Sequence, residues 1–261
     1  MRTALIYGGL GKLMTVLLAC SLFLPGFGYS LQAKTLRVAV ADYPPYTYVQ
    51  DQQMGGEGYQ AFEQIMNELG IQYRAEAVPN FGRSLIEMEN NQLDALLLAT
   101  ESPERNALAQ YSMPLFFTDW SWVWLAKRHD LQPGSADFKN GAIVSAQKNS
   151  NIYRWLALHN YQITPGTTDI RGLFNLLDHG RVDAIMLPAL TAITLINQDQ
   201  RNTAQYRIHN HIQLPMGIYI SNTYLADHPD FMLKLNQAIK NYQNDMKSAA
   251  NNNVDIVAPK K

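Results

Sequence analysis

The sequence contains a single cysteine, Cys20, which lies close to the N-terminus. If that segment is removed, the rest of the chain has no thiol, which excludes disulfides, a thiol nucleophile and thiolate metal sites. Only 16% of the residues are charged and the net charge is -1, so neither nucleic acid nor an anionic membrane surface is expected as a partner. No metal or cofactor is expected, because metal-ligand spacing is absent among the six histidines, His129, His159, His179, His209, His211 and His228.

No internal apolar run has the length of a transmembrane helix. The N-terminus instead has the pattern of a secretory signal, in which Arg2 and Lys12 supply positive charge before an apolar run at 13–24. We therefore expect residues 1–33 to be cleaved after Ala33 on export to the periplasm. An uncleaved anchor is less favoured, and so is a lipoprotein in which Cys20 is acylated.

The remaining chain alternates strand and helix patterns, and it is long enough for one large domain or two small lobes. β-branched and apolar runs predict strands at 35–41, 71–78 and 95–99, and apolar residues at helical spacing predict helices at 59–69 and 81–91. Trp120, Trp122 and Trp124 recur at period two, which predicts a long strand with one aromatic face. Such a strand suits either a connection between lobes or an ordinary sheet with a tryptophan-rich core.

After a polar linker at 130–141, the strand-helix pattern repeats, with a strand at 142–144, a turn at 148–150 and a helix at 151–159. Leu93-Asp94-Ala95 and Val182-Asp183-Ala184 both follow a helix and a polar turn and both lead into an apolar strand. This weak internal repeat favours two lobes of similar α/β construction. A strand at 215–221, a helix from His228 to about Met246 and a polar tail from Ser248 complete the chain.

The junction after the strand at 95–99 is a candidate anion site. Ser102 suits the N-cap of a helix and Pro103 its first position, which places Arg105 in the first turn. Free helix N–H groups, the Thr100 hydroxyl and the guanidinium would then converge on a carboxylate or another small anion. A solvated arginine in an ordinary strand-helix turn fits this stretch equally well.

A second candidate element follows the first strand, where two prolines hold Tyr43 and Tyr46 near the strand's end. Rigid aromatic rings at such a place suit stacking on a ligand, although a packed loop is the alternative.

Taken together, these stretches resemble the extracellular solute-binding proteins of family 3, the periplasmic receptors of ABC importers, over residues 35–247. The stretches that carry the resemblance are Tyr43-Pro44-Pro45-Tyr46, Gly58-Tyr59, Asp94-Ala95 with Thr100 and Ser102-Pro103-Glu104-Arg105, Tyr111-Ser112-Met113-Pro114, and Gly180-Arg181-Val182-Asp183-Ala184.

The resemblance implies the type II periplasmic-binding-protein fold, in which two α/β lobes, each a mixed sheet flanked by helices, are joined by two crossing strands and close on a ligand like a hinge. In this sequence, lobe 1 would comprise residues 34–121 and 214–247, lobe 2 residues 122–213, and a flexible tail residues 248–261.

The resemblance also implies roles for particular residues. Tyr43 and Phe81, with Tyr46 nearby, would flank the apolar part of the ligand, while Thr100 and Arg105 bind its carboxylate and Ser150 binds it from lobe 2. Arg105 is expected to be exposed in an open cleft, with few core contacts. Pro188 stands where the family usually has an aspartate for the ligand's amino group, which argues against a standard α-amino acid.

The function that follows is a monomeric periplasmic receptor that captures a small carboxylate-bearing solute, an amino acid or a related organic acid, for a membrane ABC permease. A sensory protein that signals to a membrane partner is the first alternative, and it is less favoured because the chain ends after one two-lobed unit. A cyclohexadienyl-dehydratase-like enzyme on the same fold is the second. Catalysis is not expected, because Glu101 and Asp119 are the only acids placed near the cleft and neither has an evident partner.

Overall fold

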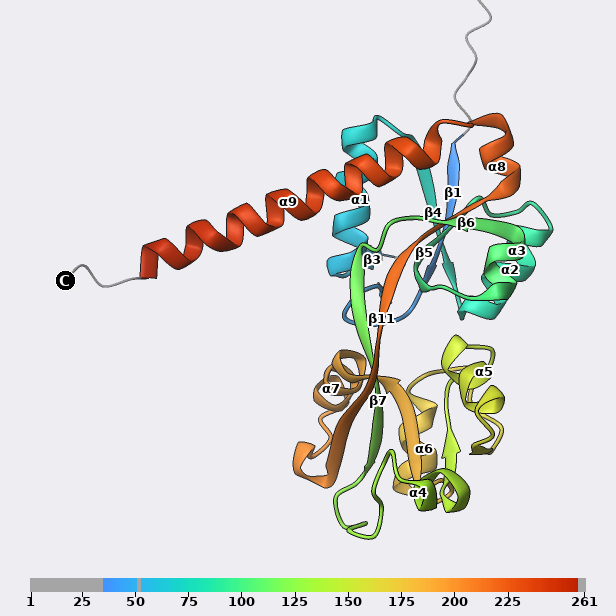
Figure 1. The fold of residues 1–261 in the computed structure, drawn as a ribbon, viewed down its shortest axis with the longest axis vertical. Coiled ribbons are helices and arrows are strands. Elements are labelled where there is room, and N and C mark those ends of the chain that lie inside the picture. Colours follow the sequence, from blue (N-terminus) through green and yellow to red (C-terminus); the bar gives the residue numbers. More distant parts are fainter. Residues whose placement is uncertain (1–34, 51–52, 258–261) are drawn as a thin grey trace, which may run out of the picture. The chain divides into compact units, whose positions relative to one another are not determined.

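The computed structural model describes residues 35–50 and 53–257, so the expected signal segment at 1–33 lies outside the described residues. Strands and helices alternate along the described chain (Figure 1). The strands are β1 (Leu36–Ala41), β2 (Tyr48–Gln50), β3 (Gln53–Gly55), β4 (Tyr73–Val78), β5 (Ala95–Thr100), β6 (Ala109–Tyr111), β7 (Phe116–Leu125), β8 (Ile143–Ser145), β9 (Gln162–Ile163), β10 (Ala184–Pro188) and β11 (Tyr206–Ser221). The helices are α1 (Glu57–Leu69), α2 (Phe81–Glu89), α3 (Pro103–Leu108), α4 (Ala136–Gly141), α5 (Asn151–Leu158), α6 (Gly172–Asp178), α7 (Ala189–Gln198), the 3-10 turn η1 (Thr203–Gln205), α8 (Asn222–Asp227) and α9 (Phe231–Val257).

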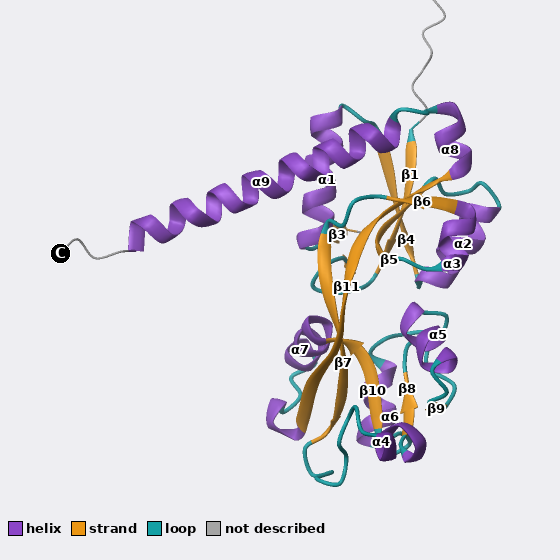
Figure 2. Ribbon diagram, in the orientation of Figure 1, coloured by secondary structure: helices purple, strands orange, loops and turns teal. Residues whose placement is uncertain are grey.

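Most of the strands form one mixed sheet in the order β4-β1-β5-β11-β7-β10-β8-β9, and β6 pairs with β11. At one end β1 runs parallel to β4 and β5, and at the other β8 runs parallel to β10 and β9. The long strands β7 and β11 lie between these two parallel groups and pair with each other in antiparallel fashion (Figure 2). Two α/β lobes joined by two long strands are the architecture that the sequence predicted.

The internal repeat corresponds to the same local structure in both lobes. The backbone N–H of Asp94 donates to the carbonyl of Arg37 at 2.8 Å, and its carboxylate accepts from the Arg37 N–H at 3.0 Å. Asp183 makes the same pair of contacts with Ile143, at 2.7 and 2.8 Å. Each aspartate therefore holds the loop before one parallel strand against the start of the neighbouring strand.

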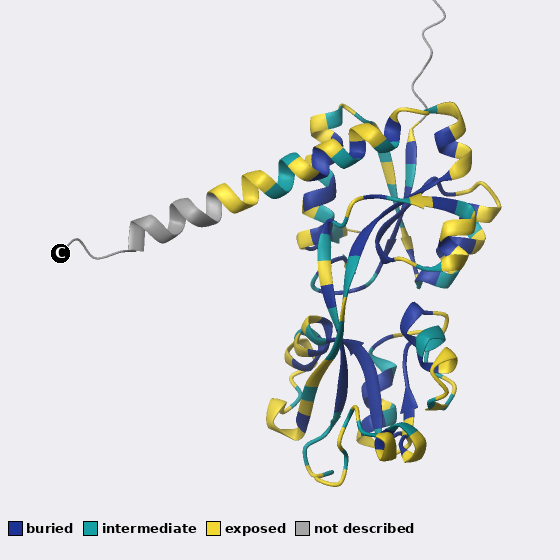
Figure 3. Cartoon of the chain, in the orientation of Figure 1, coloured by how far each residue is buried: buried dark blue, intermediate teal, exposed yellow. Residues whose placement is uncertain are grey.

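The tryptophans of β7 form one face of that strand, as their period-two spacing predicted. Trp120 and Trp122 are buried in a core cluster of the second lobe, and Trp124 packs against its edge. The ring of Trp122 meets that of Phe138 edge-on at 4.9 Å between centroids. Val123 faces the other way and belongs to the larger core cluster. Residues Trp120 to Val123 of β7 are all buried (Figure 3), so β7 both connects the lobes and supplies a core face.

The structure differs from the sequence-based expectations at three places. The linker at 130–141 contains α4, whose N-cap Ser135 accepts from the N–H of Phe138 at 3.1 Å. Strand β11 begins at Tyr206 instead of Pro215, because its residues from Tyr206 onward already pair with β7. Pro215 lies inside the strand and pairs with β7 alone, since pairing with β5 begins at Met216. A proline lacks the N–H for a second neighbour and fits at such a position.

The third difference concerns the C-terminal helix. Helix α9 continues to Val257, past the expected end near Met246 and into the segment predicted as a polar tail. No proline or glycine interrupts the sequence between these points, so nothing local stops the helix. In the described part of the chain, no helix combines the length and apolar character needed to cross a membrane.

Candidate functional site

The site is built around the junction of β5 and α3. All six residues of β5 are buried, which fixes the strand's end at Thr100 inside the protein. Ser102 is the N-cap of α3 and accepts from the N–H of Arg105 at 3.4 Å, and Pro103 stands at the start of the helix. The local structure predicted for this stretch is therefore confirmed.

The N–H groups of α3, by contrast, do not form the open anion site that the sequence suggested. The N–H of Arg105 is used by Ser102, and that of Asn106 donates to the Ser102 carbonyl at 2.9 Å. Glu104 lies in the first turn, where a hydrogen bond from its own backbone N–H lowers the pKa of its carboxyl group. The guanidinium of Arg105 is thus the group available to an anion.

Arg105 is only 2% exposed, which corrects the expectation of an exposed cleft arginine. Its Nη1 donates to the carbonyl of Thr100 and, at 3.4 Å, to the Thr100 hydroxyl, and its guanidinium lies 5.2 Å from the centre of the Phe81 ring. Its Nε is buried and has no hydrogen-bond partner among the described residues. These contacts hold the guanidinium in place but leave part of its donor capacity unused.

The charge of Arg105 is also uncompensated within the site. Across residues 35–50 and 53–257, no ion pair joins this arginine to an aspartate or glutamate. Burial lowers the pKa of Arg105 to about 10, so the group remains a cation at neutral pH. A buried cation without a counter-ion is costly, and an anionic ligand would remove that cost.

Helix α5 brings the second lobe to the same point. Ser150 is its N-cap and accepts from the N–H of Tyr153 at 3.1 Å. The side-chain amide of Asn151 donates to the Thr100 hydroxyl at 2.8 Å and to the Thr100 carbonyl at 3.2 Å. Thr100 therefore accepts hydrogen bonds from both Arg105 and Asn151, and the bonds from Asn151 join the two lobes.

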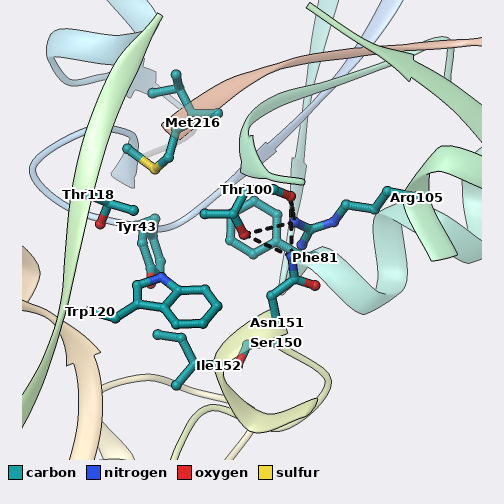
Figure 4. A pocket seen from close by; sticks show the side chains of 11 residues that line it. Tyr43, Phe81, Thr100, Arg105, Thr118, Trp120, Ser150, Asn151, Ile152 and Met216 are labelled. Atoms are coloured by element: carbon teal, nitrogen blue, oxygen red, sulfur yellow. Dashed lines mark hydrogen bonds between the residues drawn. The ribbon is translucent and has the colours of Figure 1, made fainter. Parts of the chain in front are cut away.

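Eleven residues line a small pocket at this junction (Figure 4). They are Tyr43, Phe81, Leu98, Thr100, Arg105, Thr118, Trp120, Ser150, Asn151, Ile152 and Met216. The cavity volume is about 20 Å³, which is enough for one or two water molecules and too small for an organic acid. A solute therefore requires the lobes to separate, or Asn151 to move, before it reaches Arg105.

Five of the six residues predicted to bind ligand line this cavity: Tyr43, Phe81, Thr100, Arg105 and Ser150. The rings of Tyr43 and Phe81 meet edge-on at 5.6 Å. Tyr46 lies apart from the cavity: its ring packs against Phe116 at 6.3 Å, and its carbonyl accepts from the N–H of Gly58 at the start of α1. Its place in the fold is that of a helix-capping and packing residue.

The two acids expected near the cleft do not line the cavity either. The carboxylate of Glu101 accepts from Asn106 at 2.9 Å, and that of Asp119 accepts from Gln213 at 2.9 Å. Asp119 follows Thr118 and precedes Trp120 on β7, so strand alternation turns it away from the face that these two residues share.

The site predicted from the sequence did not include most of the apolar residues that line the cavity. Thr118 and Trp120 lie on the alternating face of β7 that the tryptophan spacing revealed, so the face was predictable although its approach to the ligand site was not. Asn151 directly follows Ser150, so the same polar turn before a helix could have identified it. Met216 comes from β11, far away in sequence, and nothing in the local pattern marked it. No group of three or more His, Cys, Asp or Glu side chains suited to a metal ion occurs in the described residues.

Comparison with known proteins identifies the class. The sequence profile of the bacterial extracellular solute-binding proteins, family 3, matches residues 36–254, and the chain belongs to this family. No curated protein sequence matches the chain.

Solved structures show the same fold at low sequence identity. The chain is similar to holo ArgBP from T. maritima, with 18% identity, a TM-score of 0.66 and coverage of 80% of this chain and 90% of that one. It is similar to the GluR0 ligand-binding core from Nostoc punctiforme in complex with L-glutamate, with 17% identity, a TM-score of 0.68 and coverage of 82% and 96%. An ancestral amino-acid-binding protein described as a precursor of cyclohexadienyl dehydratase gives 17% identity, a TM-score of 0.67 and coverage of 81% and 90%. These neighbours share the two-lobed α/β fold, and they are mainly binding proteins.

Proposed function

We propose that this protein is a periplasmic receptor that binds a small carboxylate-bearing solute between its two lobes and delivers it to a membrane ABC permease. The observation that carries the proposal is the buried Arg105 in the interlobe cavity, a cation with unused donors and no acidic partner among the described residues. Such a group suits a bidentate pair with a carboxylate. Membership of the solute-binding family supports the receptor role.

The parts of the site have distinct roles in this proposal. Arg105 and Thr100 bind the carboxylate from the first lobe, and Ser150 and Asn151, at the N-terminal end of α5, bind it from the second. Tyr43, Phe81 and Trp120 contact the rest of the solute. The lobes open to admit the solute and close on it, with segments 34–121 and 214–247 moving relative to 122–213.

A melting-temperature screen of the mature protein tests the proposal. Amino acids, dicarboxylates and aromatic acids are added at about one hundred times a micromolar dissociation constant, where a ligand of the native state alone adds about 2.7 kcal/mol of stability. For a chain of this size we expect a rise in Tm of about 5–10 °C. The methyl ester of each hit serves as its control and should give no rise, whereas an equal rise with the ester would contradict a carboxylate site.

Export is a separate prediction that depends on residues 1–33. In a Gram-negative host, we expect the full-length protein to be found in the periplasmic fraction with Lys34 at its N-terminus, because the apolar run is followed by a small residue, Ala33, at the expected cleavage point. Intact-mass measurement of the purified protein checks this. A mass that corresponds to a lipid-modified chain beginning at Cys20 would show that the lipoprotein alternative is right.

A further inference from the structure

The charges around the cavity indicate which kind of carboxylate it accepts. Arg105 is the only ionisable side chain of fixed charge among the residues that line it. The remaining lining side chains are neutral, and burial raises the pKa of the Tyr43 phenol, so this group also stays neutral. The closed site therefore has an excess of one positive charge, which a ligand with a net charge of -1 neutralises.

The acids adjacent in sequence to lining residues do not line the cavity, and one of them, Glu104, accepts from its own backbone N–H. Asp42 forms an ion pair with Arg171 at 3.3 Å, and both Glu101 and Asp119 accept from side-chain amides outside the cavity. An ammonium group on the ligand would thus find no carboxylate in the lining and would lie close to the guanidinium that holds its own carboxylate. Burial of an unpaired charge beside a like charge weakens binding.

Away from the carboxylate-binding groups Thr100, Ser150 and Asn151, the cavity lining is mostly apolar. This part is lined by the rings of Tyr43, Phe81 and Trp120 and the side chains of Leu98, Ile152 and Met216, and Thr118 adds one hydroxyl. Surfaces of this kind bind an aryl or branched alkyl group by removing it from water.

We infer that the site prefers a monocarboxylate with an apolar, aryl or branched alkyl body and no α-ammonium group over the α-amino acid that has the same body. This inference rests on the proposed carboxylate-binding function and narrows it to one ligand class. The competing hypothesis is that the aromatic rings form a cage that binds the ammonium group of an amino acid by cation–π attraction.

The test compares matched ligands by isothermal titration with the purified mature protein. One pair is 3-phenylpropionate and L-phenylalanine, and the other is 4-methylpentanoate and L-leucine; within each pair only the α-ammonium differs. We expect the acid without the ammonium to bind at least tenfold more tightly in at least one pair. Phenethylamine, which has the ammonium and no carboxylate, should not bind.

The outcomes separate this inference from the proposed function. If neither acid binds at least tenfold more tightly than its amino-acid partner, or if L-arginine or L-glutamate binds more tightly than every apolar acid, the inference is wrong while the receptor function stands. If phenethylamine binds as well as the acids, the carboxylate site itself is wrong. If no acid of either kind binds, both proposals fail.

A pair of variants provides an independent measurement. Thr118→Asp places a carboxylate in the lining, and Thr118→Asn places a neutral group of the same shape there. The ratio of amino-acid affinity to matched-acid affinity should rise at least tenfold in Thr118→Asp relative to Thr118→Asn. An equal ratio in two variants with intact thermal transitions would overturn the inference, and if Thr118→Asp does not fold, the wild-type ligand pairs decide alone.

Discussion

Replacement of Arg105 by methionine should weaken binding of a carboxylate ligand by roughly thirtyfold to several thousandfold. Truncation of one partner of a desolvated, hydrogen-bonded charge pair costs about 2–5 kcal/mol of binding free energy, which corresponds to that range. Isothermal titration with a hit from the ligand screen measures the change. Methionine retains much of the buried volume of the side chain, so the loss would reflect the missing guanidinium and not a cavity.

The same substitution should leave the free energy of unfolding almost unchanged or should raise it. Arg105 is buried and has no acidic partner in the described part of the chain, and replacement of a buried charge by an apolar group of similar size is often neutral or stabilising. Urea unfolding without ligand measures this effect. Arg83→Ala is the matched control, because Arg83 is an exposed arginine paired with Glu87 on α2, and its affinity for ligand should stay within about twofold of wild type.

Two results would contradict this assignment. Wild-type affinity in Arg105→Met would show that the guanidinium does not bind the carboxylate. A loss of several kcal/mol in unfolding free energy would show that Arg105 is chiefly a structural residue that holds Thr100 in place.

Replacement of Asp94 by alanine should lower the free energy of unfolding by about 3–5 kcal/mol, the usual cost of removing one partner of a buried pair. The Asp94 side chain is 2% exposed, and its two oxygens accept from Nε and Nη2 of Arg37 at 2.7 and 2.8 Å. The same carboxylate accepts from the Arg37 N–H, which would lose its partner as well. Urea unfolding measures the loss.

Asp183 provides a matched control, because it occupies the equivalent place in the other lobe. Its side chain is 23% exposed and its partner Arg128 is 38% exposed. Water can therefore replace much of the hydrogen bonding that is lost when the ion pair is removed. Asp183→Ala should therefore cost only about 1 kcal/mol. Equal losses for the two variants would show that burial does not set the cost, and that the shared backbone contact accounts for both effects.

Much of the fold could be predicted because its signals are local. The period-two tryptophans of β7 identified a strand with one buried face, and the repeated Asp-Ala pairs indicated two lobes of similar construction. The strand-turn-helix stretch at Ser102 and Pro103 predicted its own local structure, because N-cap and proline preferences depend on only a few neighbouring residues. Boundaries were less certain. Pro215 looked like the start of a strand, although its pairing with a single neighbour lets β11 pass through it.

The sequence by itself determined the class of fold and the position of Arg105 in the first turn of a helix that follows a buried strand, and its resemblance to the family grouped Arg105 with Tyr43, Phe81, Thr100 and Ser150. Only the tertiary structure decided that Arg105 is buried with no acidic partner among the residues it describes, that Tyr46 lies apart and that Met216 and Trp120 complete the cavity. These outcomes depend on long-range packing: β5, β7, β11 and α5 meet at one point, and no local pattern encodes which side chains share a space or which charges find partners. The ligand preference of the site follows from that packing.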